Sequence, residues 1–356
     1  MAALSMITPI DKLSPDVAKE LGLLGCVPAL SCLSDPRFTY YLYAPSTYYR
    51  PTTTPPRLLV LIHHSMRNAY ALREAFQAFA QEHNLFLICP LFPIGFLDPS
   101  DTDNYKNLQY RGIRYDHVLL SIIDEVKARY PRVTIDTFGL YGFSGGAQFV
   151  HRFAYLHGKR LWGLVVAAPG SQTPWDHTCD YPAGVRDLQA VFEGTEGDWE
   201  WPLRRLPTAF MCGAQDTDTS WAKLRGRATP AEGGRLAAAR RLRESWIAQG
   251  ATRTRFIAVD GAAHEESKIL PDVQSFFAEL LTEEEQQQEV VQSTTSRTKT
   301  TIMQSQHSYS ANVATAANMD THGFSFSDSM QKNNTSKKLK PHYPGSASSS
   351  QETHPK

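Results

Sequence analysis

Residues 138–156, FGLYGFSGGAQFVHRFAYL, decide the fold, because an apolar run, a glycine-rich turn and a second apolar segment follow one another there. Phe138–Tyr141 is expected to be a short buried strand and Ala147–Leu156 a helix. Between them, residues 142–146 fit G-x-S-x-G, the spacing of a sharp strand-to-helix turn that carries a serine hydroxyl at its tip. The alternative is an ordinary glycine-rich turn. In context, the stretch predicts Ser144 as a nucleophile.

Strand-like and helix-like segments alternate on both sides of this turn. A continuous apolar run such as Arg57–His63 is typical of a central strand that is covered on both faces. The alternation predicts an α/β fold, with a mostly parallel sheet and helices on both of its faces. The other expected strands are Phe38–Tyr43, Leu85–Cys89, Leu161–Ala168, Pro207–Cys212 and Arg255–Val259, and the other expected helices are Ala69–Glu82, Tyr115–Tyr130, Gly234–Gln249 and Asp272–Leu281.

Composition divides the chain near residue 285. Residues 1–285 are expected to form one domain, within which 170–206 breaks the strand–helix rhythm. This segment is long for a loop, so a small cap-like insertion or a wall of the active site is expected there. Residues 286–356 are rich in Ser, Thr, Gln, Asn and Lys, and such a segment buries too little apolar surface to offset its ordering entropy. It is expected to be a disordered polar tail.

Bulk properties limit the possible partners and location. The 36 basic and 36 acidic side chains give zero formal net charge, which argues against attraction to nucleic acid or to an anionic membrane. The N-terminus lacks a basic region followed by a long apolar run, so no signal peptide is expected, and no stretch is apolar enough to span a bilayer. The five cysteines contain no C-x-x-C pair, which favours reduced core cysteines and a cytoplasmic protein.

A base and an acid are expected at two later strand ends. A serine hydroxyl is a weak nucleophile at neutral pH and needs a base beside it. His264 follows the last expected strand and so lies at the same sheet edge as Ser144. An acid should hold the imidazole in the right tautomer. Asp216, which follows the strand 207–212, is the preferred acid. Asp176, which follows the preceding strand, is the alternative acid, and Asp218 is the third choice.

The oxyanion that forms during acyl transfer needs backbone N–H donors. One is expected from Gly145, which follows the nucleophile. The other is expected from the loop after Arg57–His63 and is assigned to Ser65, with Met66 as the alternative. The paired histidines of this loop have no acidic or cysteine partner at ligand spacing, and no second histidine follows His264 at H-E-x-x-H spacing. Neither a metal nor a cofactor is therefore expected.

Together these residues resemble the α/β-hydrolase superfamily, and within it bacterial and fungal esterases and polyester depolymerase-like hydrolases. The resembling segments are LVLIHHSMRNAYALREAFQAFA, LICPLFP, YGFSGGAQFVHRFAYLH and VVAAPG, and the broad resemblance runs from about Arg37 to Leu281. It implies Ser144 as nucleophile, His264 as base, an aspartate as orienting acid and an oxyanion hole near Ser65 and Gly145. The expected substrate is a small-molecule ester, thioester or polyketide-like compound, in a pathway such as fungal secondary metabolism.

One departure from the family pattern is the residue pair His63-His64, where the superfamily usually has His-Gly. Glycine permits backbone angles that histidine adopts less easily, and a side chain at position 64 would narrow the pocket. Two other functions stay open, the first because of this departure and the aromatic residues of segment 170–206, and the second because a fold alone does not prove activity. The first is a non-hydrolytic condensation or cyclisation driven by the histidine base and the oxyanion hole, and the second is a catalytically inactive binding protein on the same fold.

Overall fold

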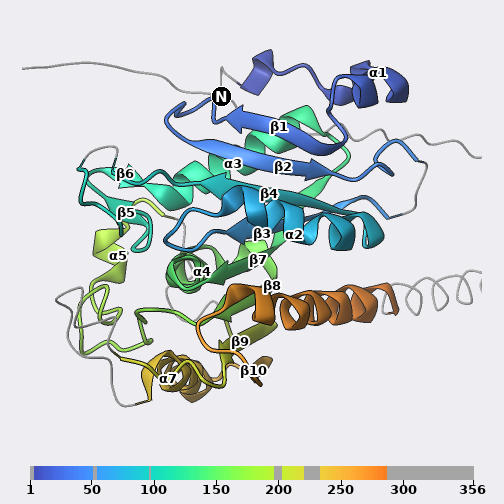
Figure 1. Ribbon diagram of the computed structural model, residues 1–356. Coiled ribbons are helices and arrows are strands. Elements are labelled where there is room, and N and C mark those ends of the chain that lie inside the picture. The colour runs from blue at the N-terminus through green and yellow to red at the C-terminus, as the bar shows by residue number, and fades with distance from the viewer. Residues whose placement is uncertain (1–3, 51–53, 96–97, 196–202, 220–232, 287–356) are drawn as a thin grey trace, which may run out of the picture. The chain divides into compact units, whose positions relative to one another are not determined.

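An eight-stranded, mostly parallel sheet organises the described part of the chain, with strand order β1-β2-β4-β3-β7-β8-β9-β10 (Figure 1). The computed structural model describes residues 4–50, 54–95, 98–195, 203–219 and 233–286. The strands from β4 to β10 pair in parallel, whereas β1 and β2 are antiparallel to their neighbours. The strands are β1 (Gly25–Ser31), β2 (Thr39–Ala44), β3 (Arg57–Ile62), β4 (Leu85–Leu91), β7 (Thr134–Phe143), β8 (Leu161–Ala167), β9 (Thr208–Gly213) and β10 (Thr254–Val259).

Helices cover both faces of this sheet. One face packs against α3 (Tyr115–Arg129), α4 (Gly145–His157) and α7 (Gly234–Ala248), and the other against α2 (Ala69–Glu82) and a helix over 266–286. None of the described helices has the length and apolarity needed to cross a bilayer. The short elements are η1 (Leu4–Met6), η2 (Ile10–Lys12), α1 (Pro15–Glu20), η3 (Gly158–Arg160), α5 (Leu188–Val191) and the small hairpin of β5 (Gln109–Tyr110) and β6 (Ile113–Arg114).

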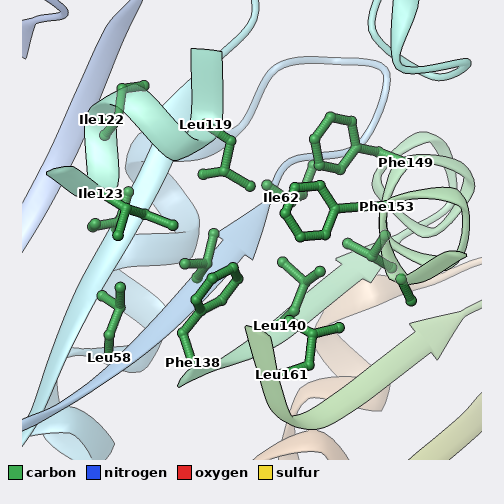
Figure 2. Close-up of a cluster of buried hydrophobic side chains, with 14 of the residues drawn as sticks. Leu58, Ile62, Leu119, Ile122, Ile123, Phe138, Leu140, Phe149, Phe153 and Leu161 are labelled. Carbon is green, nitrogen blue, oxygen red and sulfur yellow. The ribbon is translucent and has the colours of Figure 1, made fainter. Parts of the chain in front are cut away.

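The continuous apolar run of β3 is explained by its central place in the sheet. Successive side chains of a strand point to opposite faces. Leu58 and Ile62 lie in the cluster under α3 and α4, and Leu59 and Leu61 lie in the cluster under α2. All four side chains are fully buried. Figure 2 shows the first cluster, where side chains from β3 and β7 meet Leu119, Ile122 and Ile123 of α3 and Phe149 and Phe153 of α4.

The predicted α/β architecture is confirmed, but several strands differ from the prediction. The strand before Ser144, β7, begins at Thr134 and ends at Phe143, whereas Phe138–Tyr141 was expected. β1 was not predicted, because Val27 is its one buried residue, as suits a strand at the edge of the sheet. β4 was expected to end before Pro90, but it continues to Leu91. Beyond Ile88 this strand pairs with β2 and no longer with β3. A proline without an N–H is tolerated where a strand is paired on one side only.

The segment 170–206, expected from the sequence to be cap-like, is described over 170–195 and 203–206. Trp175 is buried and its ring lies edge-on to Tyr155 of α4, with 5.0 Å between centroids. The Tyr181 hydroxyl donates to the Asn107 carbonyl at 2.8 Å. These contacts attach the segment to the C-terminal half of α4 and to the loop before β5. The expected polar tail, residues 286–356, lies outside the described residues beyond 286.

Truncation of Phe153 tests the packing of α4 on the sheet. Its ring is fully buried and stacks on Phe149 at 5.7 Å. We expect Phe153→Ala to lower the free energy of unfolding by about 3–5 kcal/mol, because it removes apolar contacts and leaves a cavity. Chemical denaturation measures this loss. Ile247→Ala is the control, since Ile247 of α7 is 42% exposed, and it should change stability by less than about 0.5 kcal/mol. Equal losses of unfolding free energy in Phe153→Ala and Ile247→Ala would contradict the assignment of Phe153 to the core.

Candidate active site

The turn between β7 and α4 holds Ser144 in a strained conformation. Its φ is 53° and its ψ is −105°, a region that residues with a Cβ seldom occupy. The flanking glycines make the turn possible. A Cβ on Gly142 would lie 2.4 Å from the Gly146 backbone, and a Cβ on Gly146 would lie 2.2 Å from the Ile62 carbonyl oxygen. The hydroxyl is therefore presented beside the end of β3, at the carboxyl edge of the sheet.

Three side chains from separate strand ends meet at this edge. Ser144 Oγ lies 3.0 Å from His264 Nε2, and His264 Nδ1 lies 2.7 Å from Asp216 Oδ2. Ser144 follows β7, Asp216 follows β9 and His264 follows β10. The imidazole also stacks on Phe143, with 4.7 Å between centroids. The structure thus brings the expected nucleophile and base together with the preferred acid.

Asp216 is buried and remains ionised at neutral pH. Burial alone would raise the pKa of its carboxyl, but the hydrogen bond and charge of His264 and the Arg235 guanidinium lower it below its usual value. Arg235 Nη1 donates to Asp216 Oδ1 at 3.0 Å, which leaves Oδ2 for the imidazole. Asp176, the alternative acid, instead accepts from the backbone and side chain of Thr178 through Oδ1. Among the described residues, the carboxylate that hydrogen-bonds His264 is Asp216.

The two candidate oxyanion donors lie next to each other. A Cβ on Gly145 would lie 2.9 Å from Ser65 Oγ, so the loop after β3 touches the first turn of α4. The first N–H groups of a helix have no acceptor within the helix, which leaves the Gly145 amide available. The Met66 amide donates to His64 Nδ1 at 3.0 Å. Within the described part of the chain no acceptor is recorded for the Ser65 amide, so Ser65 is the better candidate donor.

His64 fits this loop without backbone strain. The positive φ of the loop falls on Arg67, at 60°, and not on His64. Burial, together with the charges of His264 and Arg67, lowers the pKa of His64, so its neutral ring can accept the N–H of Met66 through Nδ1. The concern that histidine would adopt the backbone angles less easily than glycine is therefore wrong. The His64 side chain does narrow the pocket, as expected, because its ring forms part of the pocket wall.

A polar network ties this loop to the loop of the base. The His64 amide donates to Asn68 Oδ1, and Asn68 Nδ2 donates to Glu266 Oε2 at 2.7 Å. The Tyr141 hydroxyl donates to the other oxygen of the same carboxylate at 3.0 Å. Glu266 stands two residues after His264, and burial raises the pKa of its carboxyl. The network connects the candidate oxyanion loop with the segment that carries the imidazole.

His63 is a structural residue. Its ring is fully buried, and burial lowers its pKa to about 3, so it stays neutral in the physiological range. One ring nitrogen, Nε2, accepts from the Phe92 amide at 3.0 Å, and Nδ1 lies 2.8 Å from the His64 carbonyl oxygen. Both nitrogens of the His63 ring are thus engaged inside the protein, and this ring braces the loop after β3.

A cavity of about 330 Å³ opens onto Ser144. Polar and apolar atoms contribute nearly equally to its walls, and four polar side chains in them were not identified from the sequence. Gln148 could have been found, because it lies one helical turn after Ser144 and so on the same face of α4. Glu266 stands two residues after the predicted base His264, whereas Arg235 and Lys106 come from distant segments and carry no such local signal. The lining residues are His64, Ser65, Met66, Lys106, Phe143, Ser144, Gln148, Gly170, Arg235, His264 and Glu266.

Substitution of Gly146 tests the close approach of α4 to β3. A Cβ there would meet two backbone carbonyl groups, which cannot move aside as a flexible side chain can. We expect Gly146→Ala to lower the free energy of unfolding by about 3 kcal/mol, measured by chemical denaturation. Gly112→Ala is the comparison, because Gly112 has φ +80° but open space around it. Gly112→Ala should lower the free energy of unfolding by about 1–2 kcal/mol, because only the positive backbone φ is unfavourable for alanine. Full stability of Gly146→Ala would contradict the contact.

No protein-family model and no curated protein sequence matches the chain. Among solved structures, a poly(aspartic acid) hydrolase-1 from Sphingomonas sp. KT-1 is similar at 22% identity and a TM-score of 0.57, over 71% of this chain and 98% of that one. LpqC, a poly(3-hydroxybutyrate) depolymerase from Bordetella parapertussis, is similar at 22% identity and a TM-score of 0.56, over 75% of this chain and 98% of that one. The likeness, the parallel sheet and the serine turn together identify the α/β-hydrolase fold.

Proposed function

We propose that this protein is a serine hydrolase that cleaves a carboxylic ester or thioester through an acyl-serine intermediate. One observation carries the proposal, namely the hydrogen-bonded series Ser144–His264–Asp216 with distances of 3.0 and 2.7 Å. A serine hydroxyl gains nucleophilicity when a base can take its proton, and an orienting carboxylate keeps that base in the right tautomer. The two similar proteins, one named as a hydrolase and the other as a depolymerase, support this reaction class.

In this mechanism His264 Nε2 takes the proton of Ser144 while Oγ attacks the carbonyl carbon of the substrate. The negative charge moves to the carbonyl oxygen, which the amides of Ser65 and Gly145 stabilise. Collapse of the tetrahedral species breaks the bond to the alcohol or thiol, which leaves with the proton from His264. Water, deprotonated by the same ring, then releases the acid from Ser144. Throughout, Asp216 stays ionised, accepts the hydrogen bond from His264 Nδ1–H and stabilises the imidazolium.

Hydrolysis is favoured over the two alternatives by specific contacts. Condensation was raised because of His64 and the aromatic residues of segment 170–206. The backbone φ of His64 is not positive and its ring braces the Met66 amide, and Trp175 of that segment is buried against Tyr155. An inactive binding protein has no need for a serine at φ 53°, a conformation that costs about 1–3 kcal/mol. The short distance between Ser144 and His264 also supports a reactive hydroxyl.

Labelling with a fluorophosphonate probe tests the nucleophile. We expect the wild-type protein to be labelled at Ser144 and Ser144→Ala to be unlabelled, because the activated hydroxyl is the group that attacks phosphorus. Intact-protein mass spectrometry and peptide mapping measure the adduct. Ser65→Ala is a useful comparison, since Ser65 lies in the same pocket but contributes its backbone amide, and it should still be labelled. Equal labelling of wild type and Ser144→Ala would reject the assignment.

Substitution of the acid tests the role of Asp216. We expect Asp216→Asn to lower kcat for a p-nitrophenyl ester by about 10³–10⁴-fold, because the amide cannot hold the imidazole in the required tautomer. Asp176→Asn is the matched control, and it should keep kcat within about twofold, since that carboxylate contacts Thr178. Steady-state kinetics at neutral pH measures both. A large loss in Asp176→Asn, with little loss in Asp216→Asn, would reverse the two assignments.

A further inference from the structure

A buried guanidinium without a carboxylate partner lies behind the pocket. Arg152 of α4 is 1% exposed, two helical turns beyond Ser144. It donates to Thr173 Oγ1, to Ser171 Oγ and to the backbone oxygens of Lys106 and Gln148, at 2.8–3.3 Å. Every acceptor is neutral, and among the described residues no carboxylate lies within ion-pair distance. Buried charges are normally paired, so this one calls for an explanation.

The carboxylates around the pocket are engaged elsewhere. Asp216 pairs with Arg235, and Asp103 pairs with the Lys106 ammonium. Glu266 accepts from Asn68 and Tyr141 on the oxyanion-loop side. On the Gln148 side of the pocket, the Arg152 guanidinium is therefore a positive charge that no carboxylate of a described residue balances.

The same guanidinium fixes the orientation of Gln148, which lines the pocket. A guanidinium can only donate, so Ser171 Oγ accepts from Arg152 at 3.1 Å. The single hydroxyl proton of Ser171 then goes to Gln148 Oε1, at 2.7 Å. With its oxygen occupied in this way, the Gln148 amide presents Nε2 as a donor. No described residue accepts from this nitrogen, and Gln148 forms part of the cavity wall.

We propose that Gln148 Nε2, with Arg152 behind it, is a subsite for a second carboxylate on the acyl group of the substrate. The proposal rests on the proposed function and specifies its substrate class as half-esters or half-thioesters of short dicarboxylic acids. Gln148 lies one turn from Ser144, about 6 Å along the helix axis. A succinyl or glutaryl group bound to Ser144 has the length to reach it. A long alkyl chain would instead desolvate the Gln148 amide, and would gain nothing from the buried charge.

Hydrolysis of matched esters tests the subsite. The p-nitrophenyl half-esters of succinate and glutarate carry the carboxylate, and the 4-methylpentanoate and 5-methylhexanoate esters place an uncharged isopropyl group at the same position. We expect kcat/KM to favour the carboxylate member of at least one pair by about tenfold or more, as a charged hydrogen bond predicts. In Gln148→Met this ratio should fall to about one, and in Gln148→Glu below one. Rates with Ser144→Ala give the non-enzymatic background.

Gln172→Met is the control, because the Gln172 amide donates to the Pro169 carbonyl and does not line the pocket. This substitution should leave the ratio of kcat/KM between the carboxylate ester and its isopropyl counterpart unchanged. A wild-type ratio near one in both pairs, or a preference that survives in Gln148→Met, would overturn the subsite.

A binding measurement separates the subsite from the reaction. Calorimetric titration of Ser144→Ala with monomethyl glutarate should give a Kd about tenfold lower than with methyl 5-methylhexanoate, and the difference should vanish in Ser144→Ala/Gln148→Met. Equal affinities would overturn the subsite even if esters are hydrolysed. Preferential binding of the anion without turnover of any ester by the wild-type protein would refute the proposed hydrolysis and support the subsite.

Discussion

The candidate site depends on a backbone-to-backbone contact between Gly146 and the end of β3. The absence of a side chain lets the first turn of α4 rest directly on the Ile62 carbonyl, and this contact sets the height of Ser144 above the sheet. The loop that carries Ser65 begins at the same end of β3. One contact therefore positions both the hydroxyl and a candidate oxyanion donor. A second contact of this kind occurs at Gly213, where a Cβ would lie 2.2 Å from the Ala263 carbonyl oxygen, directly before His264.

These two contacts leave the polar groups with little freedom. Asp216 follows Gly213 by three residues and is clamped between Arg235 and the imidazole. On the other side, Asn68 and Glu266 connect the candidate oxyanion loop with the start of the helix over 266–286. The hydrogen bonds thus act on a frame that backbone packing has already aligned, which is the condition for electrostatic preorganisation.

The parts of this arrangement that are encoded locally could be predicted from the sequence. The strand–turn–helix around Ser144 was predictable because glycine spacing and apolar periodicity both act within a few residues. Asp216 and His264 could be expected at strand ends, but the choice between Asp216 and Asp176 required the path of the chain. Arg152 could not be recognised, because a charged residue in an apolar helix is buried or exposed according to what packs on it. Here the covering residues are Ser171 and Thr173, which come from a separate segment.

The backbone of Ser144 has a consequence for the evolution of this fold. Its positive φ is disfavoured for every residue with a Cβ and is open to glycine. Replacement by glycine would relax the turn and make the native state more stable, while removing the hydroxyl that the turn exists to present. At this position stability and activity therefore oppose each other. Under the proposed function, a lineage that gave up catalysis would be expected to accumulate glycine there, and serine would be kept only where its hydroxyl is used.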